Sequence, residues 1–446
     1  MRRNRRGAIA GIAFAAPLVG HATGFFVNQQ DALALGRVNA GAAVAADSPS
    51  TVFFNPAGMP SLWKSSAPNG RDVKMSAGVN LVVPMSTFHD EGSTVSSPGT
   101  GGQPLPSGGN SIKDPADPTP VPYVYYVRRL GETGGYLGLA FNAPFGQAAK
   151  FDSTWFGRYD STEADLRTAN VSLVGAFRAT PSVSLGGGID VQGAKTKLVA
   201  AIPNPLAVGG PSPASDGRSV TRGTALSLGF NVGAIFDVTE DTSIGATYRS
   251  GIDHRLHGSV ESSGLTGLLS AANGRNDAKA VLKLPAMASA GIRSRVGRDL
   301  SVYAQYDWFG WGAFDEIAVS LDNGAQLARE ERYRNAWASS VGAEYAWTSA
   351  LSVRGGIRYD RTPTTNGFRD TTVQDSNRVW FGGGATYRMS KSTTLEFALT
   401  HVSFRRADID VTRTFFDGSP LETVAHIRGR AESQVNSASL GASFTF

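Results

Sequence analysis

The sequence predicts an all-β membrane protein: a 14-stranded antiparallel transmembrane β-barrel with an N-terminal plug. Three observations support this prediction. They are alternating apolar and small polar residues, a regular succession of short and long connections, and a final strand that ends in phenylalanine. The final strand shows the alternation most clearly, because serine, glycine and threonine separate Ala438, Leu440, Ala442, Phe444 and Phe446. A period of two places one set of side chains on each face of a strand.

Residues 1–22 are typical of a secretory signal. Arginine occupies four of the first six positions, and the apolar stretch that follows is too short to span a bilayer. Gly20 and Ala22 place small residues at a cleavage site, so we expect the mature chain to begin near Thr23. Without these arginines the formal net charge of +5 falls close to neutral, and nothing indicates nucleic acid as a partner.

Composition excludes several kinds of site. The chain has no cysteine, which rules out disulfides, Fe–S clusters and thiolate zinc sites. His254 and His257 stand three apart on an expected strand and therefore point to opposite faces, which argues against a metal pair. We expect neither a metal nor a cofactor. No later apolar run reaches about 18 residues, the length that a transmembrane helix requires.

Alternating segments recur from about residue 73 onward, for example in 225–236, 301–308 and 351–359. Many reach about 10 residues, as a tilted spanning strand requires, whereas strands of soluble proteins are usually about 5–6 residues long. We expect the apolar set to face lipid and the small polar set to face the lumen. Aromatic residues near the expected strand ends are typical of interfacial girdles; they are Tyr125, Tyr126, Trp308, Trp311, Trp347, Trp380 and Phe444.

The connections predict the strand count. Six are short, at 131–134, 179–182, 237–242, 297–299, 347–350 and 389–392. Seven are long, at 84–120, 144–163, 203–218, 259–276, 322–332, 360–375 and 408–423. Short and long connections alternate, as periplasmic turns and extracellular loops do in outer-membrane barrels, and together they join fourteen strands.

Residues 23–65 are predicted to form the plug, and residues 66–446 the barrel. The segment from 24 to about 62 breaks the alternation and is rich in alanine and glycine, with a short helix expected within Asp31–Asn39. A periplasmic tail is the alternative, but the small residues favour a plug inside the lumen. A fourteen-stranded barrel has room for one, because only smaller barrels are filled by their own side chains.

The plug segment also carries a family resemblance. The motifs GFFVN, ALGR, AAD and FFNPAG follow one another between residues 24 and 58. They resemble the N-terminal hatch of the FadL family of outer-membrane long-chain fatty acid transporters. Weaker matches continue in order along the chain: PFG at 144–146, WFGRY at 155–159, YRS at 248–250, LPA at 284–286, DW at 307–308 and GIRYD at 356–360.

The resemblance implies a passive channel of the outer membrane of a Gram-negative-type cell. Outer loops capture an apolar ligand, an internal pocket receives it, and an opening in the wall at a kinked third strand releases it sideways. The partners it implies are a fatty acid or a hydrocarbon. Outer-membrane lipid and lipopolysaccharide surround the barrel, and Phe446 resembles the signal read by the barrel-assembly machinery.

Two motifs are expected to control passage. The resemblance assigns hatch gating to Asn55, Pro56 and Ala57, although the same triplet also suits a simple turn into the first strand. The second motif contains Asn142, Pro144 and Gly146. Proline removes a ladder donor and glycine permits a kink, so this motif predicts either an interrupted wall or simply the end of strand three.

Two further groups are expected to contact the ligand. An exposed aromatic patch on an outer loop would form the capture groove, unless the loop packs on itself; its residues are Phe145, Phe151, Trp155, Phe156 and Tyr159. By the resemblance, Arg334 on a later strand faces the ligand carboxylate. A second basic position falls on Leu198, which shifts that role to Lys197. The alternative is a lumenal salt-bridge ladder, to which Arg354, Arg358 and Arg388 are assigned.

We predict that the protein is not an enzyme. Ser61 and Lys64 match a Ser-x-x-Lys pattern that is common by chance, and no nucleophile elbow or dinucleotide fingerprint is present. The preferred function is transport of long-chain fatty acids. Uptake of aromatic hydrocarbons by the same kind of channel is the alternative, and a general porin or a surface adhesin is less favoured.

Overall fold

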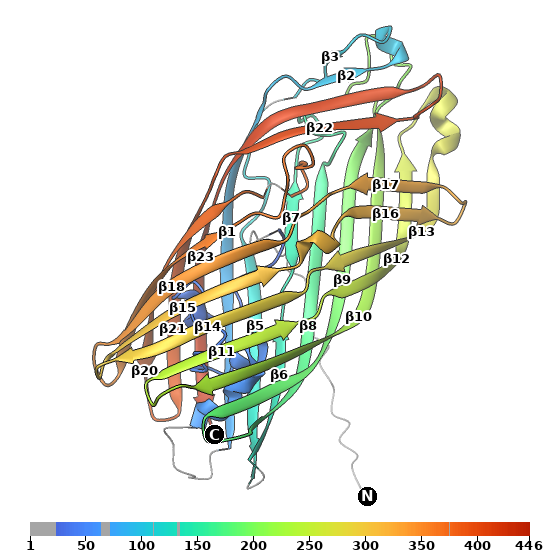
Figure 1. Cartoon of the computed structure of the whole chain (residues 1–446). Coiled ribbons are helices and arrows are strands. Elements are labelled where there is room, and N and C mark those ends of the chain that lie inside the picture. Colours follow the sequence, from blue (N-terminus) through green and yellow to red (C-terminus); the bar gives the residue numbers. More distant parts are fainter. Residues whose placement is uncertain (1–23, 64–71, 110, 132–133, 374) are drawn as a thin grey trace, which may run out of the picture.

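The computed structural model describes residues 24–63, 72–109, 111–131, 134–373 and 375–446 (Figure 1). The predicted signal segment, and the predicted boundary between plug and barrel, lie outside the described residues.

Fourteen antiparallel strands form the wall of a closed barrel, as predicted. Each pairs with the next, and the last pairs with the first. In ring order they are β1 (Val73–Asp90), β5 (Thr119–Leu130), β6 (Gly135–Asn142), β8 (Glu163–Arg178), β9 (Val183–Ile202), β10 (Gly217–Asp237), β11 (Thr242–Arg249), β14 (Met287–Val296), β15 (Leu300–Phe309), β18 (Ala336–Ala346), β19 (Leu351–Asp360), β20 (Arg378–Arg388), β21 (Thr393–Phe404) and β23 (Thr423–Thr445).

Five of the six predicted short turns lie where the sequence predicts them, at the lower end of the barrel in Figure 1. The sixth, at 131–134, includes residues outside the described ranges. The upper end carries the long connections, and several strands extend into segments that we expected to be loops. β1, for example, continues to Asp90. The additional upper elements are β2 (Thr94–Ser96), η2 (Pro98–Thr100), β3 (Leu105–Pro106), β4 (Ile112–Lys113), β7 (Gly146–Lys150), β12 (Ile252–Ser263), η4 (Gly267–Ala272), β13 (Gly274–Leu284), η5 (Trp311–Ala313), β16 (Glu316–Leu321), β17 (Gln326–Glu330) and β22 (Ala407–Phe415).

The ladder between β1 and β23 closes the barrel. It runs without a break from Lys74, opposite Thr445, to Asp90, opposite Gly429. Below it, the Phe446 amide donates to the Val73 carbonyl at 2.9 Å. Closure pairs the two edges that an open sheet would expose.

This ladder gives a direct test of the fold. Ala77 and Ala442 are register partners, and the chain has no cysteine of its own. We expect Ala77→Cys with Ala442→Cys to form a disulfide on mild oxidation, because directly opposed strand residues are about 5 Å apart. The unfolded cross-linked chain should then run faster than the reduced chain on a denaturing gel. Ala77→Cys with Ala438→Cys lies out of register and should not form the bond.

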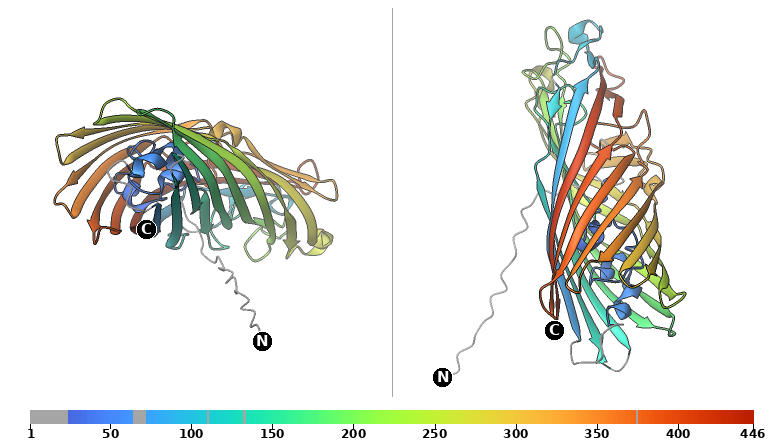
Figure 2. Two further views of the ribbon diagram at one scale, coloured as in Figure 1. Left: turned by 90° about the horizontal axis from the view of Figure 1, so that it is seen from below. Right: turned by 90° about the vertical axis from the view of Figure 1, so that its left-hand side faces the viewer.

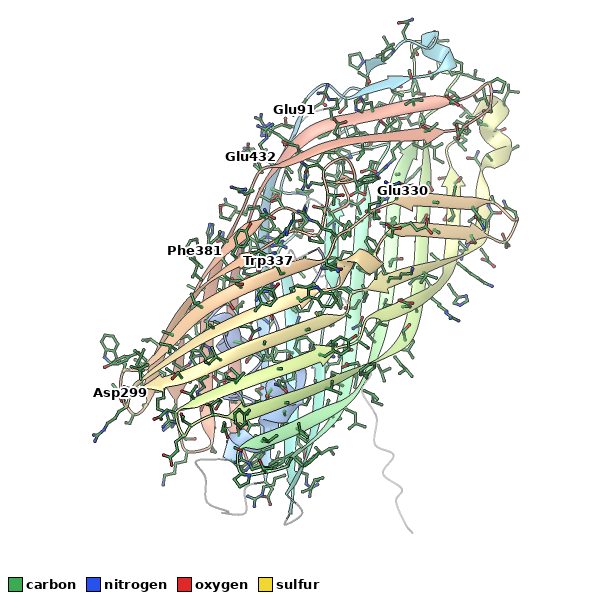
Figure 3. The ribbon with its side chains drawn as sticks, in the orientation of Figure 1. Glu91, Asp299, Glu330, Trp337, Phe381 and Glu432 are labelled. Carbon is green, nitrogen blue, oxygen red and sulfur yellow. The ribbon has the colours of Figure 1, made fainter. Side chains whose placement is uncertain are left out.

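The outer wall carries the predicted lipid-facing set. On β10, Leu226 and Leu228 are 75% and 72% exposed, and Phe230 and Val232 continue the same face. In Figure 3, Trp337 and Phe381 lie on the middle of the outer wall. Glu91, Glu330 and Glu432 lie above them and Asp299 lies below, so charged residues occur on both sides of the apolar belt.

The prediction of interfacial girdles is wrong for three of the aromatic residues assigned to them. Tyr125, Trp311 and Trp380 are at most 1% exposed and pack inside the barrel. The lumen holds a folded plug, so an inward apolar side chain is buried as effectively as one in lipid. Trp347, in contrast, is exposed at a lower turn, as expected.

Residues 24–63 fold inside the barrel as the predicted plug, which we call the hatch. They contain α1 (Ala32–Leu35), α2 (Thr51–Phe54) and η1 (Pro56–Trp63), and most of their side chains are buried. Figure 2 shows this segment enclosed by the lower part of the wall. No helix in the described ranges is long and apolar enough to cross a bilayer.

Wall glycines let the hatch backbone lie directly against the strands. A Cβ atom on Gly233 of β10 would lie 2.0 Å from Asn55 Oδ1, and one on Gly356 of β19 would lie 2.5 Å from the Arg37 carbonyl oxygen. Side chains at these positions would push the hatch inward. The heavy use of glycine in this chain therefore has a packing cause at the level of the hatch.

Buried polar contacts fix the hatch internally and to the wall. Arg37 pairs with Asp47 of the hatch at 2.8 Å and with Glu344 of β18 at 3.0 Å, and its guanidinium lies 4.2 Å from the ring centre of Tyr303. Ser50 donates to the buried Asp31 at 2.6 Å. Removing one partner would leave a buried charge uncompensated, so these contacts hold one arrangement.

Candidate ligand-binding site

Three of the cavities in the part of the lumen that the structure describes are stacked from the upper to the lower end of the barrel. With their open mouths included, the upper, middle and lower cavities have empty volumes of about 740, 510 and 910 Å³. Phe25 lines the upper cavity, Phe26 the middle one and Leu33 the lower one. The hatch therefore divides the lumen into compartments.

The upper cavity is mainly apolar. Its apolar lining comes from the inward faces of several wall strands, from the hatch and from two upper loops: Phe25, Leu166, Leu198, Leu256, Leu282, Phe314, Ile317, Val319 and Val373. Gln147, Arg329 and Glu331 are among the few polar groups. An apolar cavity with a small number of placed polar groups is the usual form of a small-molecule site.

A charged cluster lies on one side of the upper cavity. Arg329 donates from Nε to Glu331 Oε1 at 2.8 Å and pairs with Asp370 at 3.0 Å and with Asp160 at 3.7 Å. Arg413 pairs with the same Asp160 at 2.7 Å. The segments that carry these side chains are far apart in sequence, so the cluster joins β17 and β22 to the upper loops that carry Asp160 and Asp370.

Burial and the neighbouring arginines set the pKa values of the carboxyl groups in the cluster. Burial raises the pKa of Glu331 to about 8, against the pull of Arg329, and Asp370 adds to the rise. Burial also disfavours ionisation of Asp160, but Arg413 and Arg329 hold the pKa of that carboxyl at about 2. At neutral pH, Glu331 is therefore mostly protonated, and the Arg329 guanidinium faces a neutral partner at the cavity.

The third wall strand is interrupted beside the hatch. β6 ends at Asn142 and β7 begins at Gly146, and β8 has one residue fewer across the same stretch. This is a β-bulge, which bends the strand. Thr168 of β8 closes the bulge, because its hydroxyl donates to the Phe145 carbonyl at 2.6 Å.

The free edge of the interrupted strand pairs with the hatch. The Val27 amide donates to the Pro144 carbonyl at 2.8 Å, and the Gly146 amide donates to the Phe25 carbonyl at 3.0 Å. The ladder between β5 and β6 ends below this point. The segment Phe25–Val27 thus covers the place where the wall is interrupted.

Aromatic rings surround this segment and separate the upper cavity from the middle one. The ring centre of Phe25 lies 4.5 Å from that of Trp311 and 5.5 Å from that of Phe314. Phe26 lies 5.5 Å from both Phe145 and Phe309. A ligand that passes from one cavity to the next must displace these rings.

The Asn55-Pro56-Ala57 motif joins the hatch to the wall. Asn55 Nδ2 donates to the carbonyls of Ala43 at 2.7 Å and of Ala234 and Ala246 at 3.2 Å. The Ala57 amide donates to Asn55 Oδ1 at 3.1 Å. Ala234 and Ala246 belong to β10 and β11, so one side chain connects the hatch to two strands.

The expected exposed aromatic patch is absent, because the structure buries all five rings. Phe145 belongs to the lumenal cluster described above. Phe151, Trp155, Phe156 and Tyr159 form a separate upper cluster with residues of β1 and β22, and Trp155 is 1% exposed. The prediction of exposure is wrong because the loop packs on the extended strands, which was the alternative.

The two residues assigned to a carboxylate line none of the three cavities. Arg334 lies in the connection between β17 and β18, not on a strand; it is exposed, and its Nε donates to the Thr362 carbonyl at 3.3 Å. Lys197 alternates with the inward Leu198 on β9, points outward and pairs with Glu163 at 2.6 Å. Lys197 therefore lies on the outer face of the wall, and Arg334 lies on an exposed connection.

Arg329 is the cavity cation that the sequence did not reveal. It lies in the run Arg329-Glu330-Glu331-Arg332, within a segment expected to be a solvated loop. Of the arginines assigned to structure, Arg354 pairs with Glu344 at 3.1 Å and Arg358 with Asp307 at 2.6 Å. No local sequence pattern indicates which charged segment lies against the lumenal cavity.

The lower cavity is polar. Its charged lining combines both signs: Asp47, Lys74, Glu344, Arg354, Arg388, Lys391 and Glu396. Within the described ranges, no group of three or more carboxylate and imidazole side chains is arranged to hold a metal. An apolar molecule would lose its favourable surroundings on moving from the upper cavity to this one.

Sequence comparison relates the chain to known proteins. The sequence model of a family described as "Outer membrane protein transport protein (OMPP1/FadL/TodX)" matches residues 13–446. The long-chain fatty acid transport protein of Escherichia coli O6:H1 is 25% identical over 405 residues, covering 85% of this chain and 86% of that protein. Outer membrane protein P1 of Haemophilus influenzae is 24% identical over 453 residues, covering 95% and 96%.

Solved structures share the fold. A FadL homologue from Pseudomonas aeruginosa superimposes with a TM-score of 0.82 at 22% identity, covering 95% of this chain and all of that one. The toluene transporter TbuX of Ralstonia pickettii gives a TM-score of 0.63 at 20% identity, covering 94% and 99%.

Proposed function

Since the chain belongs to the FadL/TodX family of outer-membrane transport proteins, which carry hydrophobic molecules and are not enzymes, we propose that it transports long-chain fatty acids by passive diffusion. The observation that carries the proposal is the upper cavity, where an apolar lining meets one guanidinium, that of Arg329.

This combination fits an amphipathic anion. Each methylene group that leaves water for an apolar lining contributes about 0.8 kcal/mol. A carboxylate at the charged end gains a charge-assisted hydrogen bond from a guanidinium. The neutral Glu331 is the partner that such a carboxylate would replace. The similarity to a fatty acid transport protein of E. coli agrees with this substrate class.

The proposed route leaves the barrel sideways. A ligand in the upper cavity lies against Phe25, and Phe25–Val27 covers the interruption after Asn142. Movement of this hatch segment would open the wall to the membrane, and the Asn55 contacts would set how readily the hatch moves. The axial route is less favourable because the lower cavity is charged. The upper aromatic cluster around Trp155 stays a candidate for ligand capture only if its loop opens.

Aromatic hydrocarbons are the second candidate. The rings of Phe25, Phe26, Phe145 and Trp311 would suit a flat apolar ligand. Solved toluene transporters share the fold. A hydrocarbon, however, has no group that would use Arg329.

Binding by the purified full-length protein separates the two candidates. We expect titration calorimetry in detergent to detect oleate binding that excess toluene weakens little. Toluene binding without oleate binding would move the protein to the hydrocarbon candidate. If neither ligand binds while small hydrophilic solutes diffuse through proteoliposomes, the protein is a general porin.

The pKa of Glu331 predicts how binding depends on pH. Because this pKa is raised to about 8, the acid is mostly neutral at pH 7 and ionises as the pH rises through about 8. The ionised carboxylate would then compete with the ligand for Arg329, so oleate affinity should fall between pH 7 and pH 9. The glutamine of Glu331→Gln stays neutral, so this variant should lose the part of the pH dependence that comes from Glu331. The titration of oleate itself affects both proteins equally. Equal pH profiles of oleate affinity in the two proteins would contradict the competition between Glu331 and the ligand for Arg329.

A further inference from the structure

A recess on the outside of the wall gathers cationic side chains. It lies on β12, β13 and β16 and has an empty volume of about 1080 Å³ with its open side included. Arg255, His257, Lys279 and Lys283 line it, together with Glu316 and a few small or apolar residues. Leu256 and Leu282 alternate with these cations and line the upper lumenal cavity. The cations therefore point away from the lumen. Leu256, Ala280 and Val281 line both the cavity and the recess, so the two spaces adjoin across the wall.

None of these four side chains has an ion pair or a side-chain hydrogen bond among the described residues. Two other cations on neighbouring strands are paired. Lys197 pairs with Glu163 at 2.6 Å, and Arg222 pairs with Glu261 at 3.5 Å. Exposed cations that converge without a carboxylate partner favour an anion from outside the chain.

The strand register makes the recess electrostatically unfavourable when it is empty. Lys279 lies between His257 of β12 and Ser320 of β16, so neither of its register partners is acidic. Lys283 lies opposite Asp253, and Glu316 is the single acidic side chain in the lining. With Arg255 and the two lysines, positive charge exceeds negative charge. A bound anion would relieve this repulsion.

The recess begins where the lipid-facing belt ends. On β10 the exposed apolar face reaches up to Leu226. The next position on that face, Thr224, is the register partner of His257. Within the recess, Val281 is 40% exposed and provides an apolar floor beside the lysines. Val281 lies between Lys279 and Lys283 on the outer face of β13. Cations beside exposed apolar surface match a lipid whose phosphate sits at the membrane surface.

We propose that this recess binds a phosphate group of lipopolysaccharide, the phosphorylated lipid of the outer leaflet. Lys279, Lys283 and Arg255 hold the phosphate, and Val281 contacts the adjoining acyl chain. The proposal concerns the outside of the wall and does not depend on which ligand the lumen carries.

The test compares two double variants of the full-length protein in detergent. Lys279→Gln with Lys283→Gln removes two recess cations, and Lys195→Gln with Lys391→Gln removes two exposed lysines that do not line it. We expect purified lipopolysaccharide to bind the first variant about tenfold or more weakly than wild type, since each lost charged contact to phosphate matters at this scale. The second variant should bind like wild type, and dephosphorylated lipopolysaccharide should bind wild type weakly. Heat-dependent gel mobility checks that both variants fold.

Three outcomes would overturn the proposal. Equal lipopolysaccharide binding by the two double variants would show that only net charge matters. Undiminished binding of the dephosphorylated lipid would exclude a phosphate contact. A parallel loss of oleate binding in the recess variant would instead assign the recess to capture of the transported ligand. Retained oleate binding together with weakened lipopolysaccharide binding supports the proposal.

Discussion

Replacing Gly233 by alanine is expected to detach the hatch from the barrel wall. A Cβ atom at this position would lie 2.0 Å from Asn55 Oδ1, a distance that forces Asn55 to move. Its amide would then lose the carbonyls of Ala43, Ala234 and Ala246. A buried polar group without partners costs about 1–3 kcal/mol. The loss of several hydrogen bonds at Asn55 should therefore exceed the free energy that holds this part of the hatch against the wall.

Conductance reports this change directly. The hatch fills the lower lumen, so wild type should conduct poorly in a planar bilayer, and Gly233→Ala should show frequent larger openings. Gly193→Ala is the matched control, because a Cβ there meets only the Ala169 carbonyl oxygen, at 3.9 Å. Asn55→Ala should reproduce the Gly233 result. If Gly233→Ala conducts no more than Gly193→Ala, the Asn55 contacts do not hold the hatch.

Replacing Arg329 by glutamine is expected to weaken oleate binding by about tenfold to a hundredfold. The charge-assisted bond to the carboxylate is worth about 1.5–3 kcal/mol, and Arg329 is the arginine among the residues that line the upper cavity. Toluene makes no such bond and should bind Arg329→Gln and wild type alike. Calorimetry with both ligands measures the difference.

Controls separate a binding effect from a loss of folding. Arg329 compensates the buried Asp160 and Asp370, and an uncompensated buried charge can destabilise a protein by about 3–5 kcal/mol. Arg329→Lys keeps the charge and should retain part of the oleate affinity. Arg334→Gln removes an exposed arginine outside the lumen and should change nothing. A larger effect from Arg334→Gln than from Arg329→Gln would restore the original assignment of Arg334.

The wall was predictable because alternation is a direct consequence of its surroundings. Lipid demands an apolar side chain at every second position, and Leu226 to Val232 on β10 show this without interruption. Turn length also follows from the fold, so the five short turns that lie wholly within the described ranges were predicted correctly. The hatch was visible because it breaks the alternation.

The lumen was less predictable, because its contents depend on contacts between distant segments. Trp311 and Trp380 resemble girdle residues in sequence, yet each packs inside the barrel. A one-residue offset decides whether a strand residue faces in or out, and this offset misplaced Lys197. Arg329 reaches the cavity from the paired strands β16 and β17, whose position over the lumen no local pattern encodes.

The ladder that joins β1 to β23 has a consequence for how the barrel is made. The first and last wall strands must meet, so the chain forms its most distant contacts at closure. Such contacts slow folding. Until β23 arrives, β1 and β21 present open edges beside apolar surfaces meant for lipid, a state prone to aggregation. We therefore expect the yield of this protein to depend on a factor that shields the edge of β1 during assembly, more than on the stability of the closed barrel.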